Sequence, residues 1–166
     1  MQQSERPEVV ATASIVLRAD RLELRPAEVA GVSEVRFDQP VDDAAPGIRG
    51  FLEAHGVDWE AIEESSDSSY SWGGMTLAAA GGAAGAPLVT VRFEADAIGD
   101  VRLLAPERLA VGEVVDTQRH PDAYDCDGQA LIDTGSVVEE WELRAETDHD
   151  HIVTALVAPV LAGTCG

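Results

Sequence analysis

The chain has 166 residues, and its 31 Asp and Glu face 11 Arg and no Lys, which leaves a formal net charge of −20 at pH 7. Hydrophobic residues make up 45% of the chain, and this share excludes a disordered acidic tail. An acidic, lysine-free surface repels itself unless salt screens it, so the composition indicates a halophilic protein or a high-GC host.

The same charge limits the partners that we expect. Binding to nucleic-acid phosphates or to an anionic membrane surface requires clusters of basic residues, whereas the arginines stand singly among acids along the sequence. We therefore expect no direct nucleic-acid binding and no membrane contact. The first residues carry neither a basic region nor an apolar stretch, so we expect no signal peptide and synthesis in the cytoplasm.

The N-terminal quarter predicts short strands. Apolar and polar residues alternate over 9–17, 21–25 and 32–37, and Ile15 and Leu17 share one face of the first strand. The first two strands are expected to form a hairpin with a tight turn between them.

A helix is expected after this hairpin. Residues 40–47 are predicted as a loop because they contain two prolines. Ile48, Phe51 and Leu52 then fall at i, i+3 and i+4, which is the stripe of an amphipathic helix, and Gly56 is expected to end it.

The following segment is harder to assign. Asp58 is suited to cap a second short helix that includes Ile62, and residues 65–71 are predicted as a polar loop. Residues 73–87 are rich in glycine and alanine, which favours neither a stiff helix nor a well-packed strand. This stretch is interpreted either as a flexible or close-packed segment, or as an insertion that orders against a neighbouring subunit.

The C-terminal half again predicts strands, at 88–94, 101–104 and 111–115. Residues 116–135 are predicted as an acidic, turn-rich loop. The clearest hairpin comes last, with strands at 137–146 and 151–158.

These elements predict a mainly β (or α+β) fold. We expect an antiparallel β-sandwich or barrel-like domain of about eight short strands, with one or two short helices around residues 46–64. Residues 1–166 are expected to form a single domain, with a helical and Gly/Ala-rich insertion at about 46–87.

One candidate metal site lies in the acidic loop. Asp122, Asp125 and Asp127 precede Gly128, and carboxylates around a glycine turn suit Ca²⁺ or Mg²⁺. The spacing does not match an EF-hand, and solvated acids are the alternative interpretation in so acidic a chain. We expect no cofactor other than such a cation.

A second candidate metal site lies between the last two strands. His149 and His151 would point the same way on an extended segment, where they could ligate zinc or another transition metal. The alternative is a hairpin tip without a ligand, because the spacing matches no known zinc motif.

No motif indicates a catalytic residue, so the sequence favours a protein that is not an enzyme. The leading hypothesis is a structural subunit of a homo-oligomeric assembly, such as a virion tail or capsid-associated protein, whose partners are copies of itself and other assembly subunits. The alternative is a small β-rich enzyme or ligand-binding protein, with an apolar pocket lined by the 116–135 loop.

Overall fold

The structure is a computed structural model. It describes residues 13–25, 34–57, 62–65, 69–79, 88–106, 109–114, 124–126, 129–138, 141–148 and 150–161, and for the strands at 62–65, 124–126 and 129–138 it describes the backbone alone. These residues contain thirteen strands and one helix, arranged in two open sheets. The protein is therefore mainly β, as the sequence predicts.

The smaller sheet has five strands in the order β3-β2-β1-β9-β8. Their bounds are Glu34–Arg36 for β3, Arg21–Arg25 for β2, Ala13–Leu17 for β1, Val101–Leu104 for β9 and Ala97–Ile98 for β8. All neighbours are antiparallel except β1 and β9, which run parallel. A tight turn joins β1 to β2, where the Arg18 amide donates to the Arg21 carbonyl at 2.8 Å.

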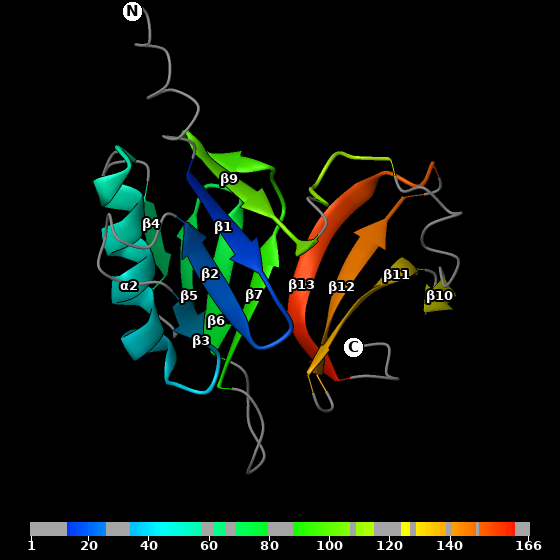
Figure 1. The fold of residues 1–166 in the computed structure, drawn as a ribbon, viewed down its shortest axis with the longest axis horizontal. Helices are drawn as coiled ribbons and strands as arrows, with labels where there is room; N and C mark the ends of the chain where they lie inside the picture. The colour runs from blue at the N-terminus through cyan, green and yellow to red at the C-terminus, as the bar shows by residue number, and fades with distance from the viewer. Residues whose placement is uncertain are drawn as a thin grey trace, which may run out of the picture.

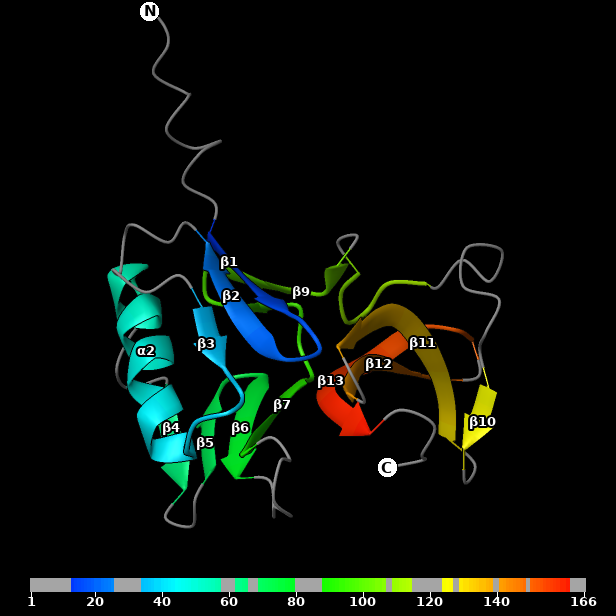
Figure 2. The same ribbon diagram turned by 60° about the horizontal axis from the view of Figure 1, so that its bottom comes forward.

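The larger sheet has eight antiparallel strands in the order β10-β11-β12-β13-β7-β6-β5-β4. Their bounds are Tyr124–Cys126, Gln129–Val138, Trp141–Thr147, Val153–Leu161, Val89–Phe93, Met75–Ala79, Ser69–Trp72 and Ile62–Ser65, in the same order. Strands β4 to β7 lie behind the five-stranded sheet, whereas β10 to β13 curve away as a second wing (Figures 1 and 2). Strand β13 joins the two halves through its pairing with β7.

The helix α2 (Val41–Ala54) covers the side of both sheets, next to β3 and β6 (Figures 1 and 2). Asp42 and Asp43 lie in its first turn, where carboxylates favour the positive end of the helix dipole. The Tyr70 hydroxyl of β5 donates to Asp42 at 2.7 Å, and this hydrogen bond ties the start of the helix to the larger sheet.

The core lies between the two sheets and the helix. The five-stranded sheet contributes Ile15, Leu17, Leu22 and Leu24 from alternate positions, as the predicted alternation requires. The other sides of the core come from α2 and from the larger sheet, with the buried residues Ile48, Phe51, Leu52, Trp72, Met75, Leu77, Val91, Phe93, Leu143, Ala145 and Leu156.

Two predictions around the helix were wrong. The helix begins at Val41, inside the predicted loop, because Val41, Ala44 and Ala45 extend the buried stripe toward its N-terminus. Pro46 is accommodated in its second turn. The prediction of a second short helix is also wrong at Ile62, which begins strand β4. The expected cap of that helix, Asp58, lies outside the described residues.

Two predicted loops, at 65–71 and 116–135, and the Gly/Ala-rich stretch at 73–87 contain strands. Residues 69–72 form β5 and residues 75–79 form β6, and Gly73 makes the turn between them with a φ of 63°. The predicted acidic loop contains β10 and most of β11. Conversely, where a strand was predicted at 111–115, the described residues 111–114 form a turn with a single bridge from Val114 to Ile152.

Candidate functional site

The predicted calcium or magnesium ligands are only partly described. Asp125 lies on β10, where its backbone pairs with Ala130, whereas Asp122 and Asp127 fall outside the described residues. His149 also falls outside them. Within the part of the chain that the structure describes, no group of three His, Cys, Asp or Glu side chains is placed to hold a metal. Both metal sites therefore stay predictions.

The segment of the second candidate metal site, which includes His151, lies at the tip of the β12–β13 hairpin, as predicted. The Asp148 carboxylate accepts hydrogen bonds from the Asp150 amide at 2.8 Å and from the Ile152 amide at 3.0 Å. His151 is exposed and has a positive φ of 63°. The Asp148 carboxylate therefore stabilises the turn through hydrogen bonds to the backbone.

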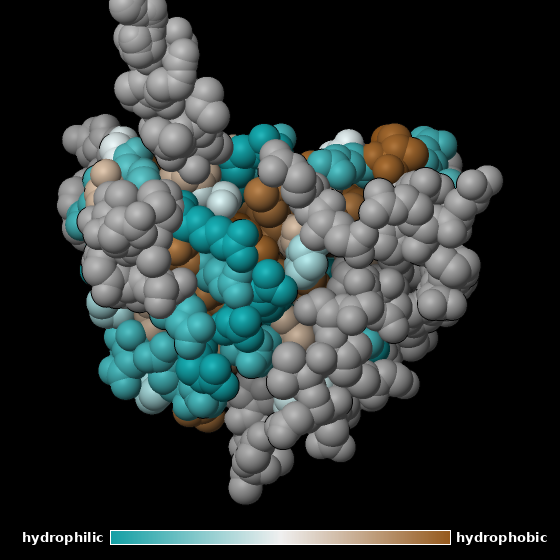
Figure 3. All heavy atoms as spheres, viewed as in Figure 1, coloured by the Kyte–Doolittle hydropathy of each residue, from teal (hydrophilic) through white to brown (hydrophobic). Residues whose placement is uncertain are grey.

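An unpredicted cluster of charges covers the outer face of β1, β2 and β3. We call it the arginine–carboxylate face, and it consists of Arg18, Asp20, Arg21, Glu23, Arg25, Glu34, Arg36 and Asp38. Hydrophilic residues gather there in the middle of the molecule (Figure 3). It contains four arginines and four carboxylates, so its formal charge is zero and the net charge of the chain lies elsewhere.

No motif in the sequence marks this face, because strand pairing assembles it. The predicted alternation over 21–25 contained part of the signal, since it puts Arg21, Glu23 and Arg25 on the face opposite Leu22 and Leu24. Pairing of β2 with β3 then brings Glu34 and Arg36 beside them.

Glu23 is the centre of this face. It forms an ion pair with Arg18 Nε at 2.7 Å and accepts a hydrogen bond from Arg21 Nη2 at 3.0 Å, and Arg25 binds its other oxygen. Burial works to raise the pKa of Glu23, but the hydrogen bonds and positive charges of Arg18 and Arg25 outweigh it. They hold this pKa below its ordinary value.

This lowered pKa predicts how Glu23 contributes to stability. The contribution is present above the unfolded-state pKa of about 4.3 and is lost as the pH falls through the lower folded-state pKa. Glu23→Gln is therefore expected to be less stable than wild type at about pH 7, with a gap that narrows below about pH 4. Urea unfolding across this pH range measures the gap.

Glu113→Gln serves as the control, since Glu113 is exposed and makes no ion pair among the described residues. Its stability should follow that of wild type at each pH. A gap between wild type and Glu23→Gln that stays constant down to about pH 3 would contradict the prediction.

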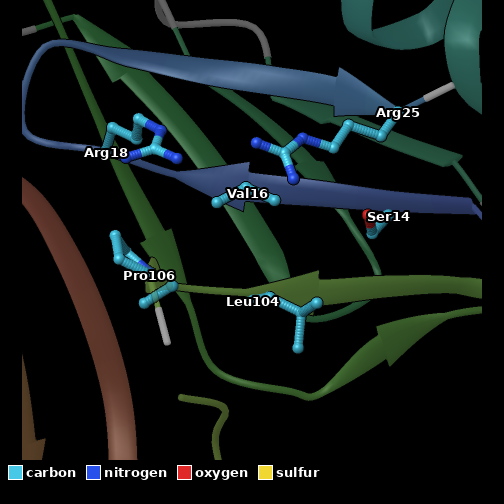
Figure 4. Close-up of a pocket in the computed structure, with 7 residues that line it drawn as sticks. Ser14, Val16, Arg18, Arg25, Leu104 and Pro106 are labelled. Carbon is cyan, nitrogen blue, oxygen red and sulfur yellow. The ribbon is translucent and has the colours of Figure 1, made fainter. Parts of the chain in front are cut away.

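A shallow pocket of about 190 Å³ adjoins the arginine–carboxylate face. It lies over β1, β2 and the end of β9 and is lined by Ser14, Val16, Arg18, Arg25, Leu104, Ala105 and Pro106. The side chains of Arg18 and Arg25 point toward each other above Val16 (Figure 4). The pocket thus combines an apolar floor with a cationic rim. This pocket is not the one predicted at the 116–135 loop, whose residues 116–123 and 127–128 lie outside the described residues.

Ion pairs also cross the outer face of the larger sheet. Arg92 of β7 reaches over β13 to Glu146 of β12, with both hydrogen bonds at 2.8 Å. These hydrogen bonds raise the pKa of Arg92 further above its ordinary value. Arg144 Nε donates to Glu142 at 2.6 Å, and both residues are almost fully buried. The Arg92–Glu146 pair therefore connects the two halves of the sheet, whereas Arg144 and Glu142 both lie on β12, and neither pair holds a reactive group in an open site.

The edge of the larger sheet is the remaining feature of interest. Strand β11 pairs with β12 along most of its length, but β10 covers only its first three residues, Gln129 to Leu131. On the side of β11 that faces away from β12, no described strand pairs with residues 132–138, which therefore form an open edge of the sheet. Between Asp133 and Val137 the register to β12 also shifts.

No family model matches the chain, and neither the curated proteins nor the solved structures contain a significant match to it. In the described part, the one helix is too short to span a membrane.

Proposed function

We propose that the chain is a non-enzymatic structural subunit of a homo-oligomeric assembly, in which copies join through the edge of β11. The observation that supports this proposal is the edge at residues 132–138, which no described strand covers. Such an edge offers a row of backbone donors and acceptors that another strand can pair with.

The composition of this edge suits pairing between copies. Residues 132–138 contain one carboxylate, Asp133, and no arginine or proline, so charge and proline do little to block this edge, although the register shift between Asp133 and Val137 interrupts it. Two identical edges can pair antiparallel about a two-fold axis, because such a contact is self-complementary; this contact joins copies in pairs, and we propose that further contacts between the pairs build the larger particle. A second copy is therefore the partner that we propose.

The net charge makes this association dependent on salt. Each copy carries −20, so free copies repel one another at low ionic strength. At about 1 M salt the Debye length falls to about 3 Å, and the repulsion no longer opposes a backbone contact. A virion tail or capsid-associated protein of a salt-adapted or high-GC host is the class of assembly that we propose.

Size-exclusion chromatography with light scattering at about 0.1 and 3 M salt tests the proposal. We expect a particle much larger than one chain at high salt and smaller species at low salt. A monomer at both salt concentrations would overturn the proposal.

A variant tests whether the β11 edge forms the contact. Ser136 lies in the stretch without register partners on β12, so Ser136→Pro removes an edge donor at little cost to the existing ladder. It should stay folded by circular dichroism and lose the large particle. Val114→Ser, which removes the most exposed large apolar side chain described, should assemble like wild type. Loss of assembly in Val114→Ser alone would assign the contact to an apolar patch instead.

The alternative function, an enzyme or ligand-binding protein that uses the 116–135 loop, stays a prediction. No observation on the described residues favours it. We assign no catalytic residue.

A further inference from the structure

We propose that the shallow pocket over β1, β2 and β9 binds a small carboxylate that carries a short apolar chain. This inference is independent of the proposed assembly, because it rests on different residues. The floor, the rim, the charge and the size of the pocket support this proposal.

The floor of the pocket is apolar although it lies on the outer face of the five-stranded sheet. Val16 and Leu104 are each only 6% exposed, and Ala105 and Pro106 continue the same surface at the end of β9. Ile15 and Leu17 flank Val16 on β1 and face the core, so Val16 faces the other way and lines the pocket. An aliphatic chain of a few carbons would bury its surface against this floor.

The rim of the pocket supplies donors for an anion. Arg25 is 56% exposed, and its one ion pair with described residues is the contact of Nη2 with Glu23. A guanidinium carries five N–H donors in a planar fork, so Arg25 retains donors for a carboxylate. Its guanidinium and that of Arg18 converge above Val16 (Figure 4), where the head of such a ligand would lie.

The charge of the pocket favours a ligand with one negative charge. Its lining includes two arginines and no carboxylate, and the adjacent Glu23 neutralises one of the two. One positive charge therefore remains when only the lining and Glu23 are counted, although the arginine–carboxylate face as a whole has a formal charge of zero. A monoanion would balance it, whereas the acidic surface elsewhere repels anions.

The size of the pocket limits the ligand. A volume of about 190 Å³ corresponds to about six water molecules at roughly 30 Å³ each. A carboxylate on a chain of four carbons, such as pentanoate, is of this size. The same chemistry occurs in a free short-chain acid and in the C-terminal carboxylate of a peptide that ends in an apolar residue.

Titration of the whole protein with pentanoate, followed by NMR or calorimetry at low ionic strength, tests the proposal. We expect saturable binding with a dissociation constant of about 1 mM. Pentanol and pentylamine should bind at least about tenfold more weakly, because they lack the negative charge. Acetate should also be weaker, because it lacks the chain. Equal binding of pentanol and pentanoate, or no saturable binding, would overturn the proposal.

N-acetyl-leucine and its amide distinguish the two sources of the carboxylate. Tighter binding of N-acetyl-leucine than of pentanoate would assign the site to a peptide C-terminus, and the reverse would assign it to a free acid. Equal binding of N-acetyl-leucine and its amide would count against a carboxylate site.

Two arginine variants locate the binding. Arg25→Gln should weaken pentanoate about tenfold, the loss expected for one charge-assisted hydrogen bond. Arg36→Gln makes the same charge change on the same face but away from the pocket lining, and it should change the affinity less than about twofold. Equal effects of the two variants would show that the anion responds to overall charge and would overturn the assignment.

Discussion

Replacement of Phe93 by alanine is expected to lower the free energy of unfolding by about 3–5 kcal/mol. Phe93 is fully buried on β7, where its register partners are Met75 of β6 and Leu156 of β13. Its ring therefore packs where the two halves of the larger sheet meet. Removal leaves a cavity that β-strands paired on both sides cannot close.

Guanidinium or urea unfolding at one fixed salt concentration measures this loss, since salt itself changes the stability of so acidic a chain. Thr90→Ala is the matched control, because Thr90 lies on the same strand but faces outward and is half-buried. It should change the stability by less than about 0.5 kcal/mol. A loss below about 1 kcal/mol for Phe93→Ala would mean that β7 is not central to the core.

The strands that the sequence predicted best are those with one face in the core. On β7, Val89, Val91 and Phe93 are buried and Thr90 and Arg92 are not, so a period of two is directly visible. The same holds for Leu22 and Leu24 on β2. On β12, Leu143 and Ala145 are buried at alternate positions, but Trp141 at the strand end is only half-buried.

Elements that depend on tertiary contacts were not predictable from local pattern. Pro46 indicated a loop, yet the buried stripe of Val41, Ala44 and Ala45 against the core outweighs the lost helical donor. Strand β10 has three residues amid acids and turn formers, and it exists through pairing with β11. Local propensity carries little information about either element.

The arginine–carboxylate face shows the same limit for a candidate site. Each of its members is ordinary in the sequence, because acids are frequent and the arginines follow no known motif. Only the register of β1, β2 and β3 places Arg18, Arg21 and Arg25 around one carboxylate, Glu23. The adjacent pocket also needs β9, which is remote in sequence and pairs with β1 in parallel.

Replacement of Gly74 by alanine is expected to cost about 3 kcal/mol, because a side chain has no room there. A Cβ at Gly74 would lie 2.2 Å from the Cβ of Ala95 and 2.9 Å from its backbone nitrogen. The backbones cannot separate cheaply, since the Gly74 carbonyl accepts a hydrogen bond from the Glu94 amide at 2.6 Å. The variant must therefore shift the β5–β6 turn away from the end of β7.

Gly50→Ala is the matched control for the same chemical change. Gly50 lies in α2 with no atom within 4 Å of an added Cβ, so alanine should raise the stability by about 0.5–1 kcal/mol through helix propensity. Thermal or urea unfolding of the two variants should thus give effects of opposite sign. If Gly74→Ala were as stable as wild type, the turn and β7 would not approach so closely, and the glycine-rich stretch would have no packing role at this position.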